Sequence, residues 1–145
     1  VTAPRPDGLT QAAAIRQALD EAGYDSDDVL YINAHGTGTA LNDVSETAAF
    51  KIALGEDAYK AHISSTKGST GHLLGAAGAA EAVAAILALR DGIVPPTANL
   101  DETDPECDLD YTPNRAVKAD LTIAISDSLG FGGHNGCVAF RKYNN

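Results

Sequence analysis

The feature that most limits the possible folds of this sequence is an Ala- and Gly-rich segment near its middle. The longest strongly apolar stretch covers residues 73–89 and is interrupted by Gly75, Gly78 and Glu81. These interruptions favour a buried helix over a membrane span. Each glycine costs roughly 1 kcal/mol in a helix interior relative to alanine, so another backbone is expected to pack closely against them. A helix with so few large side chains is predicted to be central and buried.

Short β-rich runs and helical patterns alternate along the rest of the chain. Asp43 with Glu46 makes a capping-box pattern that is typical of a helix start. Two β-rich runs near the C-terminus flank a glycine loop and indicate a hairpin. This order predicts a layered α/β domain with a mixed sheet over residues 1–145. The predicted helices cover 10–22, 43–54 and 72–90, the strands 28–34, 61–65, 121–126 and 137–142, and a polar surface connection 101–113.

The charge balance argues against two classes of partner. Among 145 residues, 20 are acidic and 10 are basic, which gives a net charge of -10. A nucleic-acid partner or an anionic membrane surface would require a basic face, so neither is expected. The chain opens with neither a methionine nor a signal peptide. Its start at Val1 is therefore expected to reflect processing or truncation, and its location is expected to be cytoplasmic.

Neither of the two cysteines has the surroundings of a nucleophile. Cys107 lies between Glu106 and Asp108, whose negative charges disfavour a thiolate. Cys137 lies in an apolar run and is predicted to be a strand residue. A structural disulfide is disfavoured in a chain without secretory signals.

A histidine followed by alternating glycine and threonine, His35-Gly-Thr-Gly-Thr39, cannot continue a regular strand. Glycines let the backbone approach a ligand, and the two hydroxyls can donate or accept hydrogen bonds there. The segment is not a dinucleotide fingerprint, because the third glycine is missing. Two interpretations stay open: a polar strand-to-helix turn, or a ligand loop at the carboxyl end of a strand.

A second polar segment, Ser64-Ser-Thr-Lys-Gly-Ser-Thr-Gly-His72, leads into the Ala- and Gly-rich helix. It can be a capped helix start with a solvated Lys67. If the helix is central, however, His72 is buried and its imidazole is neutral, so its N–H can face a substrate oxygen. Glu81 would be costly in an apolar helix without a partner, and Lys67 is the obvious cation. The alternative is that Glu81 lies on a solvated face.

Together, His35, His72 and Lys67 could form a cluster that stabilises an oxyanion. The four histidines of the chain form neither an HxxxH nor an HExxH pattern, so no metal site is expected.

Four motifs stand out in the sequence: His35-Gly-Thr-Gly-Thr39, the segment 65–78, the segment 88–100, and Gly130-Phe-Gly-Gly133 with Asn135. In their order and spacing, they resemble those of the β-ketoacyl-carrier-protein synthases, which are decarboxylating condensing enzymes of the thiolase-like fold. The similarity covers essentially all 145 residues and is to the C-terminal half of those enzymes. It implies a thiolase-like half, with the half that carries the nucleophilic cysteine absent from this chain.

The resemblance also implies roles for individual residues. His35 and His72 match the two catalytic histidines of the family, Lys67 matches its lysine, and Glu81 matches the partner of that lysine. Phe131 matches a gating phenylalanine beside the nucleophile, whose backbone N–H could complete an oxyanion hole. The residues that match those holding the phosphopantetheine arm are Thr2, Thr37 and Thr39.

The implied reaction is a decarboxylative Claisen condensation between malonyl-carrier and an acyl thioester in fatty-acid biosynthesis. A polyketide ketosynthase and a non-catalytic chain-length subunit are the alternatives, and retention of both histidines with Lys67 argues against the second. Leu129 and His134 stand where many members carry Phe and Thr, which leaves acyl-chain preference open.

The implied partners are acyl carrier protein, the absent half and, at full length, a second copy of the enzyme. Substrates arrive on the phosphopantetheine of the carrier, and no cofactor is expected on the chain itself. The chain alone is predicted to be inactive.

Overall fold

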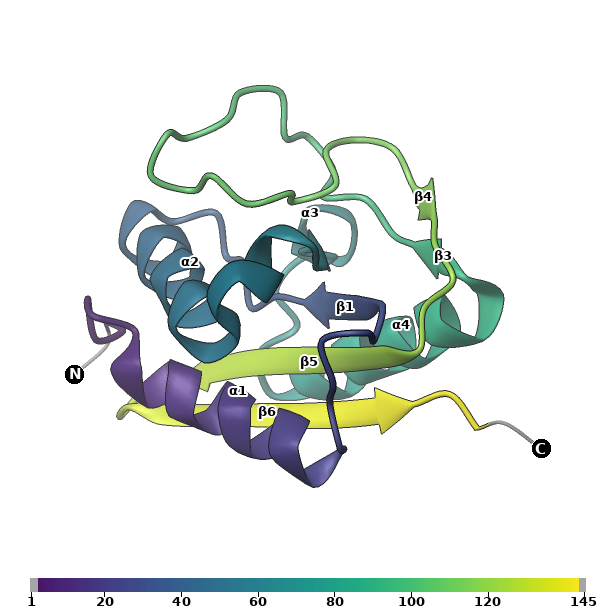
Figure 1. Ribbon diagram of the computed structural model, residues 1–145. Helices are drawn as coiled ribbons and strands as arrows, with labels where there is room; N and C mark the ends of the chain where they lie inside the picture. Colours follow the sequence, from purple (N-terminus) through teal and green to yellow (C-terminus); the bar gives the residue numbers. More distant parts are fainter. Residues whose placement is uncertain (1–2, 144–145) are drawn as a thin grey trace.

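A four-stranded mixed sheet forms the middle layer of the protein, whose computed structural model describes residues 3–143 (Figure 1). The strand order is β2-β1-β5-β6. β1 (Leu30–Asn33) runs parallel to β2 (His62–Ser64) and to β5 (Ile123–Gly130), and β6 (His134–Arg141) is antiparallel to β5. The predicted mixed sheet with a C-terminal hairpin is therefore confirmed.

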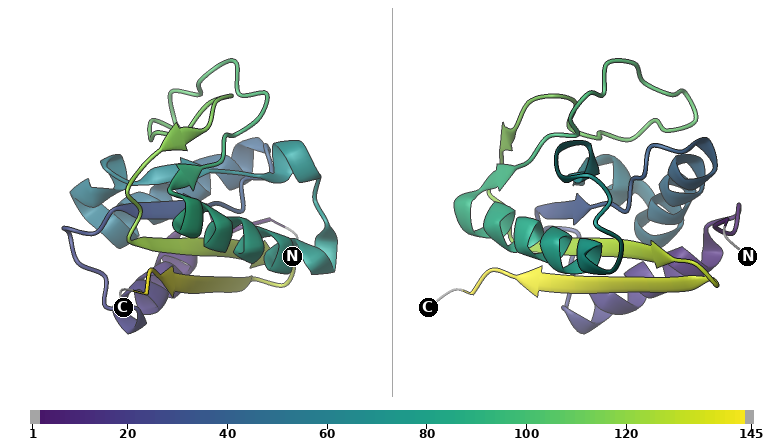
Figure 2. Two further views of the ribbon diagram at one scale, coloured as in Figure 1. Left: turned by 90° about the vertical axis from the view of Figure 1, so that its right-hand side faces the viewer. Right: turned by 180° about the vertical axis from the view of Figure 1, so that it is seen from behind.

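Helices cover both faces of this sheet. α1 (Leu9–Glu21) and α2 (Ala40–Leu54) pack against each other on one face, and α4 (Ala77–Asp91) lies on the opposite face (Figure 2). The remaining elements are short: η1 (Gly55–Tyr59), α3 (Lys67–Thr70), η2 (Leu74–Ala76), β3 (Ile93–Val94) and β4 (Val117–Lys118).

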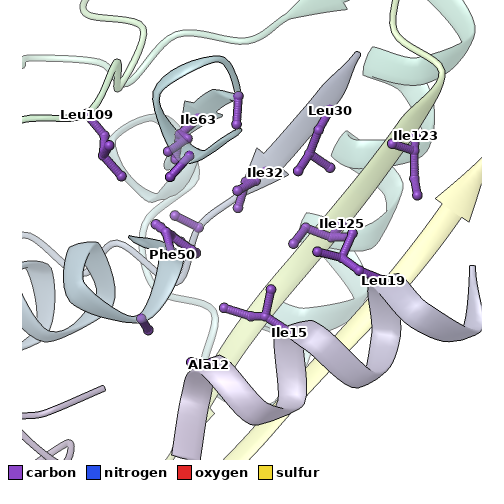
Figure 3. Close-up of a cluster of buried hydrophobic side chains, with 14 residues drawn as sticks. Ala12, Ile15, Leu19, Leu30, Ile32, Phe50, Ile63, Leu109, Ile123 and Ile125 are labelled. Carbon is purple, nitrogen blue, oxygen red and sulfur yellow. The ribbon is translucent and has the colours of Figure 1, made fainter. Parts of the chain in front are cut away.

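The alternation of side chains along the strands divides the buried residues between the two faces. On the α1 and α2 side, Ile32, Ile63 and Ile125 pack with Ile15 and Phe50 in the larger core (Figure 3). On the α4 side, the smaller core contains Tyr31 and Ala124, which come directly before Ile32 and Ile125 in their strands. Ala85, Leu89 and Leu121 complete this core. The sheet is thus buried on both sides.

The Ala- and Gly-rich helix differs from its prediction in three respects. It begins at Ala77 rather than His72, because residues 71–76 form a turn that contains η2. Only one side of α4 is buried, and no described segment covers the other side, where the exposed residues are Val83, Ile86 and Leu87. A Cβ at Gly75 would meet nothing within 4 Å, and one at Gly78 would make only ordinary contact. The prediction that another backbone packs closely against these glycines is therefore wrong within residues 3–143.

The other boundaries agree with the prediction more closely. The hairpin strands are longer than predicted, since Gly130 pairs with His134 and the turn is confined to residues 131–133. The predicted connection 101–113 contains no helix or strand. The two-residue pair of β3 with β4 was not predicted. None of the helices within residues 3–143 is both long and apolar enough to cross a bilayer.

Candidate active site

Two polar motifs meet at one edge of the sheet because they follow neighbouring parallel strands. His35 comes two residues after the end of β1, and Ser65 comes directly after β2. The backbone N–H of Ala34 donates to the carbonyl of Ser64 at 2.9 Å, which extends the pairing to the ends of both strands. The carboxyl edge of a parallel sheet is the usual place for a ligand site.

Ser65 holds the two motif loops together. Its hydroxyl donates to the carbonyl oxygen of Gly36 at 2.7 Å and accepts from the backbone N–H of Lys67 at 3.4 Å. Gly36 has a φ of 41°, and a Cβ at this position would lie 2.4 Å from the Ser65 Cβ. Only glycine therefore allows the His35 turn to approach the second loop this closely.

The structure brings His35 and His72 together, with ring centroids 5.6 Å apart and planes at 85°. The Nδ1 of His72 accepts from the backbone N–H of Leu74 at 3.1 Å. When Nδ1 accepts, the proton of a neutral imidazole is on Nε2, so the Nε2–H of His72 is free to donate. Leu74 has a φ of 52°, a strained conformation of the kind that gathers at functional sites.

The sequence predicts that His72 is buried, and this prediction is wrong for the part of the chain that the structure describes. His72 is exposed, because residues 71–76 precede α4 at the edge of the sheet and no described segment covers them. His35, by contrast, is only 8% exposed.

The imidazole of His35 is neutral at physiological pH. Burial and, after it, the positive charge of Lys67 together lower its pKa to about 4. The Nδ1 atom of His35 is buried and has no hydrogen-bond partner within residues 3–143. The ring can therefore act as a neutral donor or acceptor beside His72.

Lys67 and Glu81 form a buried ion pair, as predicted. Their side chains are 6% and 3% exposed, which excludes a solvated Lys67 and a Glu81 on a wet face. Glu81 lies on the buried side of α4, and within residues 3–143 the cation that pairs with its carboxylate is Lys67 of α3. The pair thus holds the charge of Lys67 close enough to act on the His35 imidazole.

Glu46 contributes to the site in a way that the capping-box interpretation missed. Its two carboxylate oxygens accept from the backbone N–H groups of His35, at 2.7 Å, and Gly36, at 2.8 Å. The helix starts after Thr39, which makes no side-chain cap. The available signal was periodicity, because Glu46 precedes the core residues Ala49 and Phe50 by three and four positions and so shares their face.

The remaining candidates lie nearer the surface. The hydroxyls of Thr37 and Thr39 are 3.0 Å apart on the turn before α2. Phe131 lies at the tip of the β5–β6 turn and is 78% exposed. In the part of the chain that the structure describes, its ring pairs with neither imidazole. Thr2 lies outside the described residues.

The two cysteines are free thiols without activation. Burial raises the pKa of Cys107, and burial followed by the charge of Asp127 raises the pKa of Cys137 far above its ordinary value. Neither forms the thiolate that a nucleophile requires. Across residues 3–143, no three His, Cys, Asp or Glu side chains gather in a group that could hold a metal ion.

Comparison with known proteins gives a consistent set of relatives. Residues 1–101 match the family model described as beta-ketoacyl synthase, C-terminal domain. Over 143 residues, the chain is 53% identical to the 3-oxoacyl-[acyl-carrier-protein] synthase 2 of Synechocystis sp. and 48% identical to that of Staphylococcus aureus. Each alignment covers 99% of this chain and 34% of the relative. The chain therefore spans about a third of the length of these relatives.

A solved structure gives the same result. The chain superimposes with a TM-score of 0.93 and 40% identity on the AntDE:AntF complex, a type II polyketide ketosynthase bound to its acyl-carrier protein. The alignment covers 99% of this chain and 35% of the ketosynthase chain.

Proposed function

Since the chain belongs to the β-ketoacyl synthase family, whose C-terminal domain it carries, we propose that it is the C-terminal half of a 3-oxoacyl-[acyl-carrier-protein] synthase of fatty-acid biosynthesis. Its mixed sheet between helical layers is the thiolase-like α/β fold of ketosynthases. One observation carries the proposal above all: neutral His35 lies against His72 beside the buried charge of Lys67.

The reaction is a decarboxylative Claisen condensation. A cysteine outside this chain holds the acyl group as a thioester, and malonyl-carrier binds with its thioester oxygen between His35 and His72. The carbon–carbon bond to the carboxylate breaks, carbon dioxide leaves, and the electron pair remains as an enolate. N–H donors from the two imidazoles stabilise the enolate oxygen, and a preorganised donor of this kind contributes ~3 kcal/mol.

Condensation follows when the enolate carbon attacks the acyl carbonyl. The new carbon–carbon bond forms, the carbonyl oxygen becomes negative, and its collapse expels the cysteine thiolate. We assign the backbone N–H of Phe131 to this second oxyanion. Its place on an exposed turn leaves that N–H available to a reaction centre formed with the other half of the enzyme.

Lys67 and Glu81 act on the protonation state of the site. Burial and, after it, the fixed charge of Lys67 lower the pKa of His35, so the imidazole enters the reaction neutral. Glu81 holds Lys67 in place from α4. Thr37 and Thr39, with Thr2, are assigned to the phosphopantetheine arm of the carrier, the only prosthetic group that the reaction requires.

The proposed partners are acyl carrier protein, the other half of the enzyme and a second copy of the whole enzyme. The exposed apolar side of α4 and a groove of about 790 Å³ along β6 support packing of another domain on this one.

The net charge of -10 on this chain repels an acidic carrier protein. Docking of the carrier is therefore assigned mainly to surfaces outside this chain. The proposed location of the enzyme is the cytoplasm.

A polyketide ketosynthase is the second candidate, because the AntDE:AntF ketosynthase is 40% identical to this chain. The two candidates share the chemistry and differ in the acyl chain that is extended. A non-catalytic chain-length subunit fits less well, since it has no use for two paired imidazoles beside a buried lysine.

The reaction is tested with the longer protein that contains this chain and a cysteine-bearing half. When this longer protein is supplied with an acyl thioester and malonyl-carrier, we expect it to release carbon dioxide and to form a β-ketoacyl-carrier, which mass spectrometry detects. The 145-residue chain alone is expected to form no acyl-enzyme, because neither Cys107 nor Cys137 is activated. The proposal would be contradicted if the isolated chain became acylated and either Cys107→Ala or Cys137→Ala abolished this acylation. A longer protein without condensing activity would also contradict it.

A further inference from the structure

The connection between β3 and β4 is anchored to the sheet, although it contains no helix or strand (Figure 1). We call residues 97–114 of this connection the strap. Its two ends meet, since the backbone N–H of Thr97 donates to the carbonyl of Thr112 at 2.9 Å and that of Asn114 donates to the carbonyl of Thr97 at 3.0 Å. The Thr112 hydroxyl donates to the carbonyl of Ile63 in β2 at 2.8 Å. The strap is therefore attached to the strand that leads into the active site.

The side chain of Thr97 connects the strap to the loop that carries Lys67, residues 65–68. Its Oγ1 accepts the backbone N–H of Ser65 at 3.1 Å and donates to the carbonyl oxygen of Tyr111, within the strap, at 2.6 Å. β2 ends one residue before Ser65, so this N–H is the first beyond the strand. Because a backbone N–H away from water needs a partner, Thr97 fixes the point at which the chain leaves the sheet.

Two glycines bring backbones close together on both sides of this loop. A Cβ at Gly36 would lie 2.4 Å from the Cβ of Ser65, and a Cβ at Gly68 would lie 2.8 Å from the carbonyl oxygen of Ala98. The first glycine belongs to the His35 turn, and the second faces the strap. The loop is thus packed between the turn and the strap, with no room for a side chain at either contact.

Ser65 connects the strap to both groups of the site. Its backbone N–H is held by Thr97, whereas its hydroxyl donates to the Gly36 carbonyl at 2.7 Å and accepts from the Lys67 N–H at 3.4 Å. The charge of Lys67 in turn acts on the His35 imidazole. A shift of Ser65 therefore changes the position of the turn and of the lysine together.

We propose that Thr97 is a positioning residue, which holds the Lys67 loop against the His35 turn from the side of the strap. It acts through Ser65. Without the Thr97 hydroxyl, the Ser65 N–H and the Tyr111 carbonyl lose their shared partner, and the contact between the loop and the strap loosens. The loop then withdraws from the turn, and the lysine charge and the packing that buries His35 change with it. The effect on catalysis rests on the function proposed above, whereas the positioning does not.

The first test compares Thr97→Val and Thr97→Ser with the wild type in the longer protein. Valine keeps the shape of the side chain and removes both hydrogen bonds, whereas serine keeps the hydroxyl. Because burial and, after it, the charge of Lys67 lower the pKa of His35, Thr97→Val should raise this pKa toward its ordinary value of 6.5, as measured by NMR titration. It should also slow malonyl-carrier decarboxylation about tenfold, since a displacement of about 1 Å can cost about a hundredfold. Thr97→Ser should keep the pKa and the rate close to those of the wild type.

Thr122→Val is the matched control. The Thr122 hydroxyl makes the same kinds of hydrogen bond at the opposite end of the sheet, since it accepts the backbone N–H of Val29 at 3.0 Å and donates to Oδ1 of Asp28 at 2.7 Å. Val29 and Thr122 directly precede β1 and β5. Thr122→Val should therefore lower the denaturant midpoint as Thr97→Val does, and it should leave the His35 pKa and the decarboxylation rate close to those of the wild type.

Hydrogen exchange in the wild-type protein tests the same contact without a substitution. The Ser65 amide should exchange at least about tenfold more slowly than an unprotected amide, because it donates to Thr97. Exchange at the unprotected rate would overturn the proposal, even if Thr97→Val does not fold. So would an unchanged His35 pKa in folded Thr97→Val, or an equal rise of that pKa in Thr122→Val. If the pKa rises in Thr97→Val alone and the wild type decarboxylates no malonyl-carrier, the positioning stands and the proposed reaction fails.

Discussion

Replacing Lys67 with alanine is expected to lower the free energy of unfolding by on the order of 3–5 kcal/mol. The substitution leaves the Glu81 carboxylate, only 3% exposed, without its cation on the buried side of an Ala-rich helix. An unpaired charge there costs far more than the net stabilisation that the ion pair provides. The measurement is a denaturant titration of the longer protein and its Lys67→Ala variant.

Companion variants isolate the contact between these two side chains. Glu81→Gln should be milder than Lys67→Ala, because its amide oxygen still accepts from the ammonium group. Lys67→Met combined with Glu81→Leu should recover stability without recovering decarboxylation. Lys60→Ala, which removes an exposed lysine paired with Asp57, is the matched control and should leave the denaturant midpoint almost unchanged. A coupling energy near zero in the double-mutant cycle would mean that Lys67 and Glu81 do not interact.

The second large effect concerns the paired imidazoles. His35→Ala and His72→Ala should each slow malonyl-carrier decarboxylation by at least about a hundredfold, which is the usual loss when one oxyanion donor is removed. The effect should be specific to that step. Transfer of the acyl group to the cysteine of the other half depends less on these donors and should be retained better.

His62→Ala provides the control for this pair, since His62 lies at the start of β2, whereas the site lies at the other end of that strand. It should decarboxylate at close to the wild-type rate. Folded His35→Ala and His72→Ala proteins that also decarboxylate near that rate would contradict the donor role.

The layered fold could be predicted because local patterns determine it. Alternation of β-rich and helical segments indicated the mixed sheet, and the strand ends placed His35 and Lys67 at one edge. The surroundings of α4 could not be predicted in the same way. Its bare, Ala-rich surface indicated a central, buried helix, but within residues 3–143 only the side that faces the sheet is covered.

The site was predictable where a residue's chemistry is unusual for its position. A glutamate in an apolar helix requires a cation, which correctly paired Glu81 with Lys67. Glu46 and Asp127 were missed because each has an ordinary local explanation, a helix cap and a strand residue. Glu46 accepts from the turn after β1. Asp127 accepts from Gln11 on α1, 116 positions away in the sequence, which no local spacing reveals.

Titration of the His35 imidazole by NMR in the longer protein tests the central claim most directly, namely that this ring works as a neutral hydrogen-bond donor. Burial and the neighbouring charge of Lys67 predict a pKa of about 4, so the ring should stay neutral throughout the range in which an ordinary histidine becomes protonated. Lys67→Met should raise that pKa toward its ordinary value. Protonation of His35 at or above pH 6.5, the ordinary histidine value, in the wild-type protein would contradict the account.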